Sequence, residues 1–224
     1  MSIDYVYDVK LPDEYNSETK YPVIFALHGL GSNEQDMLGL LSDLSSDFIV
    51  IGIRGHLPQG SGFAYFHIKS IGNPIREHFD QSMQQLQQFI EMAATQYAID
   101  PVRRYLLGFS QGAVLSMCLA LTMGERIKGI VALNGYIPSF VKDEYWIQSV
   151  TDLSVFISHG EHDPIFPKQL GDNNHEFFRK LSHHVTYTTY PSAHGVSLEN
   201  QQDFIRWIRQ DAAAAHIPGK GDLQ

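Results

Sequence analysis

A serine lies between two glycines where a strand-like segment changes into a helix-like one. Residues 108–112 read Gly-Phe-Ser-Gln-Gly, after a strand-like run at 103–107 and before a helix-like run at 113–121. Such a sharp turn exposes the serine hydroxyl, and glycine is needed on both sides because a Cβ would collide with the neighbouring strand or helix. The motif Gly-x-Ser-x-Gly alone is weak evidence for a catalytic serine, because it can occur by chance in a chain with 18 glycines. The strand before it and the helix after it make Ser110 a predicted catalytic nucleophile.

A serine hydroxyl needs a general base, and the base needs an acid that orients it. Among eleven histidines, His194 is predicted to be the base because it follows the last strand-like segment, 185–190, directly. His28 and His159 precede glycines at the ends of strand-like segments. We expect these two to hold loops through hydrogen bonds rather than to take part in the chemistry.

Two carboxylates compete for the role of the acid. Glu161 and Asp163 both follow the strand-like segment at 154–158. Asp163 is favoured because Pro164 stiffens the turn directly after it. Glu161 stays open as the alternative.

An attacking serine also needs two backbone N–H groups that stabilise the oxyanion. One comes from the residue after the nucleophile, which is Gln111, and the other from the loop after the strand at 21–27. In that loop, His-Gly-Leu-Gly at 28–31, Leu30 is the predicted donor. The alternative is that this sequence forms an ordinary tight turn.

The segments that must position these residues alternate between strand and helix patterns. Strands are predicted at 5–11, 21–27, 48–53, 103–107, 127–133, 154–158 and 185–190, and helices from Ser32 or Asn33 to about Leu44 and at 77–97, 113–121, 167–183 and 197–208. This order implies a mostly parallel, doubly wound α/β sheet flanked by helices, with an antiparallel edge strand at 5–11. In such a sheet, ligands bind beyond the carboxyl ends of the strands.

The composition limits the partners. The balance of 16 Lys+Arg against 25 Asp+Glu gives 16 − 25 = −9, which disfavours nucleic acid and anionic membranes. Cys118, the one cysteine, is predicted to be a buried thiol. No metal or cofactor is expected, because the histidines lack ligand spacing such as His-Glu-x-x-His. We expect a cytoplasmic protein with one domain at 1–216 and a C-terminal tail at 217–224, and we leave a homodimer open.

Three loops could form an apolar wall beside Ser110. The stretch 54–76 is too long for an ordinary connection, so it is predicted to be an irregular functional loop or partial cap that is too short for a full lipase lid. The segment between 133 and 154 is predicted to be a second loop, and a third follows Asp163. The predicted substrate-binding residues are Phe63, Tyr65, Phe66, Tyr136, Ile137, Ile165 and Phe166.

Four blocks of the sequence together resemble the phospholipase/carboxylesterase family of α/β-hydrolases. They are Leu-His-Gly-Leu-Gly at 27–31, Gly-Phe-Ser-Gln-Gly-Ala at 108–113, Gly-Glu-His-Asp-Pro-Ile-Phe-Pro at 160–167 and Ala-His-Gly-Val at 193–196. The resemblance implies the same nucleophile, acid, base and oxyanion donors as above. Residues 54–66 are similar to the bacterial carboxylesterase branch. Residues 65–67 read Tyr-Phe-His, where the acyl-protein thioesterase branch usually has a Trp-Phe-Asp-like sequence.

These observations predict a serine carboxylesterase that hydrolyses short to medium acyl esters through an acyl-enzyme. Its partner is a small-molecule ester. An acyl thioesterase or a lysophospholipase that uses the same site is the enzymatic alternative. A ligand-binding module on a hydrolase scaffold is the non-enzymatic one.

Overall fold

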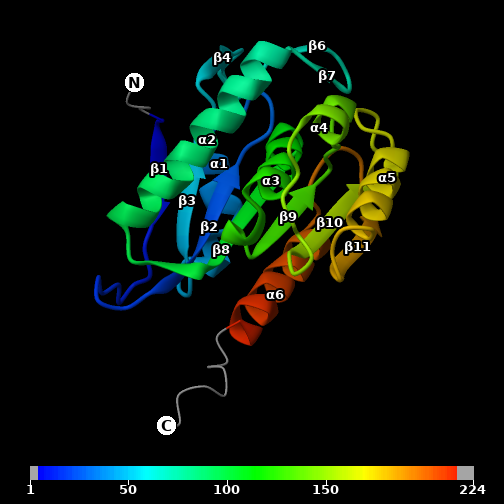
Figure 1. Cartoon of the computed structure of the whole chain (residues 1–224). Coiled ribbons are helices and arrows are strands. Elements are labelled where there is room, and N and C mark those ends of the chain that lie inside the picture. Colours follow the sequence, from blue (N-terminus) through cyan, green and yellow to red (C-terminus); the bar gives the residue numbers. More distant parts are fainter. Residues whose placement is uncertain (1–4, 216–224) are drawn as a thin grey trace.

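A seven-stranded sheet forms the centre of the computed structural model, which describes residues 5–215 (Figure 1). Every strand is parallel to its neighbours except β1, which pairs antiparallel with β3 at one edge. The predicted mostly parallel α/β fold with an antiparallel edge strand is therefore confirmed. The predicted tail at 217–224 lies outside the described residues. Across the sheet the order is β1 (Tyr7–Lys10), β3 (Ile49–Ile53), β2 (Tyr21–Leu27), β8 (Ile99–Phe109), β9 (Gly129–Leu133), β10 (Ser154–Gly160) and β11 (His184–Tyr190).

Helices cover both faces of this sheet, as the alternation along the central strand β2 requires. Ile24 and Ala26 pack on the face covered by α1 (Glu34–Leu40) and α6 (Leu198–Ala214). Val23 and Phe25 pack on the opposite face, with buried residues from α2 (Arg76–Gln96), α3 (Gln111–Met123), α4 (Ser139–Glu144) and α5 (Lys168–Phe178). None of the described helices combines the length and the apolar character needed to cross a membrane.

Helix ends settle one alternative and correct several predicted boundaries. Asn33, not Ser32, caps α1, because its side chain accepts from the backbone N–H of Gln35 at 2.8 Å and of Asp36 at 3.3 Å. The helix ends at Leu40, and a separate 3₁₀ turn follows at Ser42–Leu44. Helix α5 ends at Phe178 instead of 183, and α6 continues to Ala214 beyond the predicted 208. Two elements were not predicted: α4 lies in a segment predicted to be a loop, and a second 3₁₀ turn spans Gly124–Arg126.

Strand β8, which carries the chain to Ser110, is longer than the predicted 103–107. It begins at Ile99, and Pro101 lies inside it. From the pair Tyr21–Ile99 to the pair Val23–Arg104, β8 advances five residues while β2 advances two. Pro101 lies in this bulge, where its missing N–H costs the sheet no ladder hydrogen bond.

The stretch 54–76 was predicted to be an irregular loop, and this prediction is wrong. Its residues form two small hairpins before α2 begins at Arg76. The first pairs β4 (Leu57–Gln59) with β5 (Gly62–Ala64), and the second pairs β6 (Ile68–Ser70) with β7 (Asn73–Pro74). Gly60 and Gly72, with φ of 60° and 80°, supply the left-handed conformations in the connections. Alternation over three-residue strands was too brief to distinguish hairpins from a loop.

Candidate active site

Ser110 occupies a strained turn between β8 and α3. Its φ of 53° and ψ of −113° are rare for a residue other than glycine. A Cβ on Gly108 would lie 2.2 Å from a backbone atom of Gly112, and one on Gly112 would lie 2.0 Å from the carbonyl oxygen of Leu27. Both flanking glycines are therefore required by close backbone packing.

The structure brings Ser110, His194 and Asp163 together from three strand-end loops. The Oγ of Ser110 lies 2.8 Å from Nε2 of His194, and Nδ1 of His194 lies 2.7 Å from Oδ2 of Asp163. A neutral imidazole that donates Nδ1–H to the carboxylate leaves Nε2 free to accept the serine proton. This geometry suits proton transfer from a serine hydroxyl to a histidine.

Four hydrogen bonds hold the buried carboxylate of Asp163. Its Oδ1 accepts from the backbone N–H groups of Ile165 and Phe166, both at 2.8 Å. Its Oδ2 accepts from Nδ2 of Asn134 at 2.9 Å as well as from His194. Burial raises the pKa of Asp163, but the hydrogen bonds, led by that from Asn134, outweigh it and hold the pKa below its ordinary value. The acid is thereby kept ionised.

The competing carboxylate, Glu161, lies in a different environment. It is exposed, and its Oε1 accepts a hydrogen bond from Oγ1 of Thr189 at 3.0 Å. Only Asp163 of the two is hydrogen-bonded to His194. The geometry therefore favours Asp163 as the orienting acid.

Asn134 is a site residue that the sequence reasoning missed. It directly follows β9 and adopts a left-handed conformation, with φ of 54°, which turns its amide toward Asp163. The signal that could have found it is the Asn-Gly pair at 134–135, placed where a parallel strand ends.

His28 and His159 hold loops, as predicted. In His28, Nδ1–H donates to the carbonyl oxygen of Gly29 at 2.7 Å, and Nε2 accepts from the N–H of Gly55 at 2.9 Å. Burial lowers the pKa of His28, which favours this neutral form. The Nε2 of His159 is 2.7 Å from the carbonyl oxygen of Phe166, so His159 supports the loop that carries Asp163.

The two predicted oxyanion donors line one cavity with Ser110. The segment at 28–31 does form a tight turn, closed by the N–H of Ser32 on the carbonyl oxygen of Gly29 at 3.2 Å. Among the described residues, no hydrogen bond uses the backbone N–H of Leu30 or Gln111. Gln111 also opens α3, where the helix dipole favours negative charge. The two N–H groups are thus available to a ligand oxygen.

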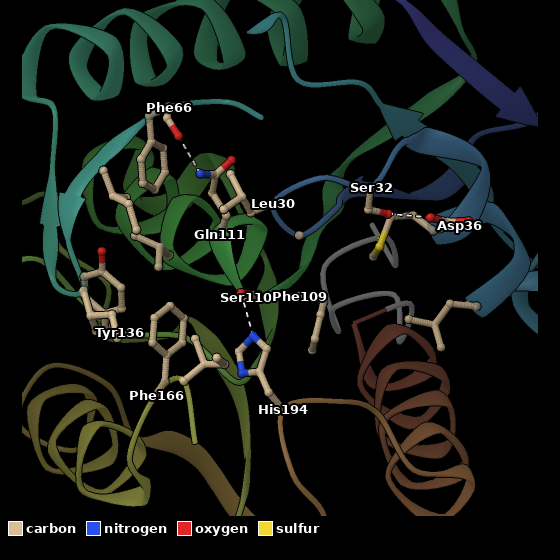
Figure 2. Close-up of a pocket in the computed structure, with 17 residues that line it drawn as sticks. Leu30, Ser32, Asp36, Phe66, Phe109, Ser110, Gln111, Tyr136, Phe166 and His194 are labelled. Atoms are coloured by element: carbon tan, nitrogen blue, oxygen red, sulfur yellow. Dashed lines mark hydrogen bonds between the residues drawn. The ribbon is translucent and has the colours of Figure 1, made fainter. Parts of the chain in front are cut away.

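The side chain of Gln111 has a different task. Its Oε1 accepts from the N–H of Tyr65 at 2.7 Å. Its Nε2 donates to the carbonyl oxygen of Phe66, also at 2.7 Å (Figure 2). These two bonds connect the beginning of α3 with the segment between the two hairpins. Gln111 therefore presents a predicted oxyanion donor through its backbone and holds one wall of the cavity through its side chain.

The cavity beside Ser110 has a volume of about 490 Å³. Of the seven predicted substrate-binding residues, four line it: Phe66, Tyr136, Ile165 and Phe166. In Figure 2, Phe66, Tyr136 and Phe166 surround one side of the space next to Ser110. An apolar wall made from three loops is thus present, although its composition differs from the prediction.

Phe63, Tyr65 and Ile137 do not line the cavity, so the prediction is corrected for these three. Phe63 lies under the guanidinium of Arg54, with 4.6 Å between Cζ and the ring centroid. The hydroxyl of the fully buried Tyr65 accepts from the N–H of His28 at 3.2 Å. Ile137 is buried in the core. Each contact directs the side chain toward the body of the protein.

Several lining residues were not predicted. Ile68 and Ile71 belong to the second hairpin, and their apolar character within the 54–76 stretch was a usable signal. Residues from the loop after β2, from α1 and beside Ser110 carried no such signal, because only the fold brings α1 to the nucleophile. This second group comprises Gly29, Ser32, Asp36, Met37, Leu40, Phe109 and Val114.

Among the described residues, no group of three or more His, Cys, Asp or Glu side chains is arranged to hold a metal ion. Cys118 is a buried free thiol, as predicted.

Comparisons with known proteins agree with the fold and with the family that the sequence resembles. The model of the family described as Phospholipase/Carboxylesterase matches residues 14–210. The acyl-protein thioesterase 1 of Kluyveromyces lactis is 32% identical over 209 residues, covering 83% of this chain and 90% of that protein. The acyl-protein thioesterase 1 of Candida albicans is 30% identical over 216 residues, covering 86% and 93%.

Solved structures share the fold at lower identity. The carboxylesterase of Bacillus cereus superposes with a TM-score of 0.82 at 22% identity, covering 93% of this chain and 95% of that one. The carboxylesterase of Mesorhizobium loti gives a TM-score of 0.79 at 17% identity, covering 92% and 94%. The chain is a hydrolase with the α/β-hydrolase fold, and it belongs to the phospholipase/carboxylesterase family.

Proposed function

We propose that this protein is a serine carboxylesterase that hydrolyses short to medium acyl esters of small molecules. The observation that carries the proposal is the hydrogen-bonded series Ser110, His194 and Asp163, in which the serine occupies a strained elbow beside an apolar cavity. A non-catalytic binding module would have no need for a serine in this conformation within 2.8 Å of a histidine.

The proposed reaction has two halves. In the first, Nε2 of His194 takes the proton of Ser110 while Oγ bonds to the ester carbonyl carbon, and the N–H groups of Leu30 and Gln111 stabilise the oxyanion. The tetrahedral intermediate collapses as the carbon–oxygen bond to the alcohol breaks, and His194 returns the proton to that alcohol. In the second half, water attacks the acyl-enzyme by the same route and releases the carboxylic acid.

Acyl length should have an optimum. Each CH₂ that enters the apolar part of the cavity contributes about 0.8 kcal/mol, so kcat/KM should climb over the first few carbons. It should fall once the chain exceeds the cavity of about 490 Å³. The measurement is kcat/KM for p-nitrophenyl esters from acetate to palmitate. A steady rise to palmitate with activation at an oil–water interface would contradict a small cleft that lacks a lid.

A second candidate, an acyl thioesterase, is supported by the two relatives named acyl-protein thioesterase 1 that share 30–32% identity with this chain. The same serine and oxyanion donors would serve a thioester, because the acyl-enzyme is identical. Matched butyryl esters and thioesters with the same alkyl leaving group distinguish the two. We expect the higher kcat/KM for the ester, and the reverse order would favour the thioesterase. Measuring kcat/KM for lysophospholipids in the same assay tests the lysophospholipase alternative.

A further inference from the structure

The cavity extends to both sides of Ser110, and its two sides differ chemically. One side, here the apolar arm, has no charged side chain among Leu30, Phe66, Tyr136 and Phe166, and the hairpin after Phe66 adds Ile68 and Ile71 (Figure 2). The other side, here the carboxylate arm, has Ser32, Asp36 and Phe109, and α1 adds Met37 and Leu40. In Figure 2, Ser32 and Asp36 lie across Ser110 from Phe66 and Tyr136.

Helix geometry places the residues of the carboxylate arm on one surface. Leu40 is four residues after Asp36 and three after Met37 in α1, so its side chain neighbours both on the surface of the helix. Ser32 joins this surface, because its Oγ donates to Oδ2 of Asp36 at 2.6 Å. The arm thus presents one carboxylate surrounded by apolar side chains.

The charge of Asp36 is not balanced by a cation. Among the described residues, Asp36 forms no ion pair. Two residues earlier in the same helix, by contrast, Glu34 is paired with Arg54. Asp36 is exposed, and the whole chain carries a net charge of −9. A ligand cation would therefore meet an unpaired carboxylate at this end of the cavity.

Phe109 adds an aromatic ring to the same arm. Its ring centroid lies 5.1 Å from that of His194, the residue that would protonate the departing alcohol. Alkylammonium groups combine a positive charge with apolar methyl surface, and both aromatic rings and carboxylates attract them. A neutral alkyl group in this arm would desolvate the carboxylate without compensation, and an anionic group would be repelled.

We propose that the carboxylate arm is a leaving-group site for alcohols that carry an alkylammonium group, and that Asp36 determines this specificity. The proposal rests on the proposed esterase function. The uncharged apolar arm takes the acyl chain, so the alcohol part extends toward Asp36 and Phe109. Once Ser110 is acylated, the alcohol leaves past an exposed carboxylate, and the apolar arm keeps the acyl chain.

The test compares butyrylcholine with 3,3-dimethylbutyl butyrate, a neutral ester of nearly the same shape. We expect the protein to prefer the choline ester about fivefold in kcat/KM, the size of a favourable exposed ion pair. In Asp36→Asn the preference should disappear through a fall in kcat/KM for butyrylcholine, because the lost interaction is one with the cation. The kcat/KM for the neutral ester should not fall, because that ester no longer desolvates a carboxylate. Raising the salt from roughly 10 mM to roughly 1 M should also reduce the preference, because salt screens exposed charges.

Asp13→Asn is the matched control, because Asp13 is an exposed carboxylate before β2, at the opposite end of the strands from Ser110. It makes the same change in net charge and should leave the preference intact. Asp36 is in the first turn of α1, so the melting temperature of Asp36→Asn must be measured beside its kinetics.

The outcomes separate the two proposals. Equal rates on both esters, or a preference that survives in a folded Asp36→Asn, would overturn the leaving-group site and leave the esterase function standing. Absence of hydrolysis of either ester, together with no fluorophosphonate labelling of Ser110, would overturn the esterase function and the leaving-group site with it.

Discussion

Replacing Ser110 with alanine should reduce kcat/KM for p-nitrophenyl butyrate at least about a thousandfold and abolish labelling by a fluorophosphonate. The hydroxyl that forms the acyl-enzyme is lost, and no neighbouring group lies in its place 2.8 Å from His194. The protein should still fold, because the elbow conformation is set by the close packing of Gly108 and Gly112 rather than by the hydroxyl. Kinetics, mass-spectrometric labelling and a melting curve measure the three effects.

Ser116→Ala is the matched control for this experiment. Ser116 is a buried serine in α3, the helix that follows Ser110, and its Oγ has no hydrogen-bond partner among the described residues. Its replacement should leave kcat/KM and labelling near those of the wild type. Residual activity of Ser110→Ala above ~10⁻³ of the wild type would remove Ser110 from the role of nucleophile.

Asp163→Asn should lower kcat by about 10⁴-fold, the size known for the same change in serine proteases. In the wild type, the carboxylate of Asp163 accepts from Nδ1 of His194 at 2.7 Å and fixes the tautomer in which the unprotonated Nε2 faces Ser110. An amide that offers its own N–H to Nδ1 would favour the opposite tautomer, and it would lack the charge that stabilises the imidazolium. Stopped and continuous assays of ester hydrolysis give kcat directly.

Glu161→Gln provides the comparison, since it neutralises the carboxylate that competed for the same role. Glu161 is exposed and bonded to Thr189, so only a few-fold decrease in kcat is expected. If Glu161→Gln were the more damaging of the two, Asp163 would not be the orienting acid.

The sequence was sufficient for the parts of the site that depend on local constraints. Gly108 and Gly112 are required by backbone contacts next to Ser110, so the elbow could be recognised from a few residues. Asp163 and His194 follow parallel strands whose carboxyl ends meet at one edge, so alternating strand and helix patterns placed them near the serine. The preference for Asp163 over Glu161 rested on the proline that follows, and that turn does place two backbone N–H groups on the carboxylate.

Side-chain directions in the 54–75 stretch could not be predicted. Whether an aromatic residue there faces the cavity or the core depends on hairpin register and on long-range bonds. Tyr65 and Phe66 are neighbours, yet Tyr65 is directed to the loop of His28 while Phe66 lines the cavity. Asp36 was missed for a similar reason, because nothing near it in the sequence indicates that α1 lies beside Ser110.

The second hairpin, β6–β7, has a consequence for how this enzyme could diversify. The N–H of Ile75 donates to the carbonyl oxygen of His67 at 2.8 Å, which closes the base of the hairpin. Just before this base, Gln111 fixes the carbonyl oxygen of Phe66. Residues 68–73 between these anchors, including Ile68 and Ile71 of the apolar arm, are exposed, and the hairpin pairs with no strand of the central sheet. A graft or a change of length there would create new acyl selectivity while the inherited hydrolytic machinery stays in place.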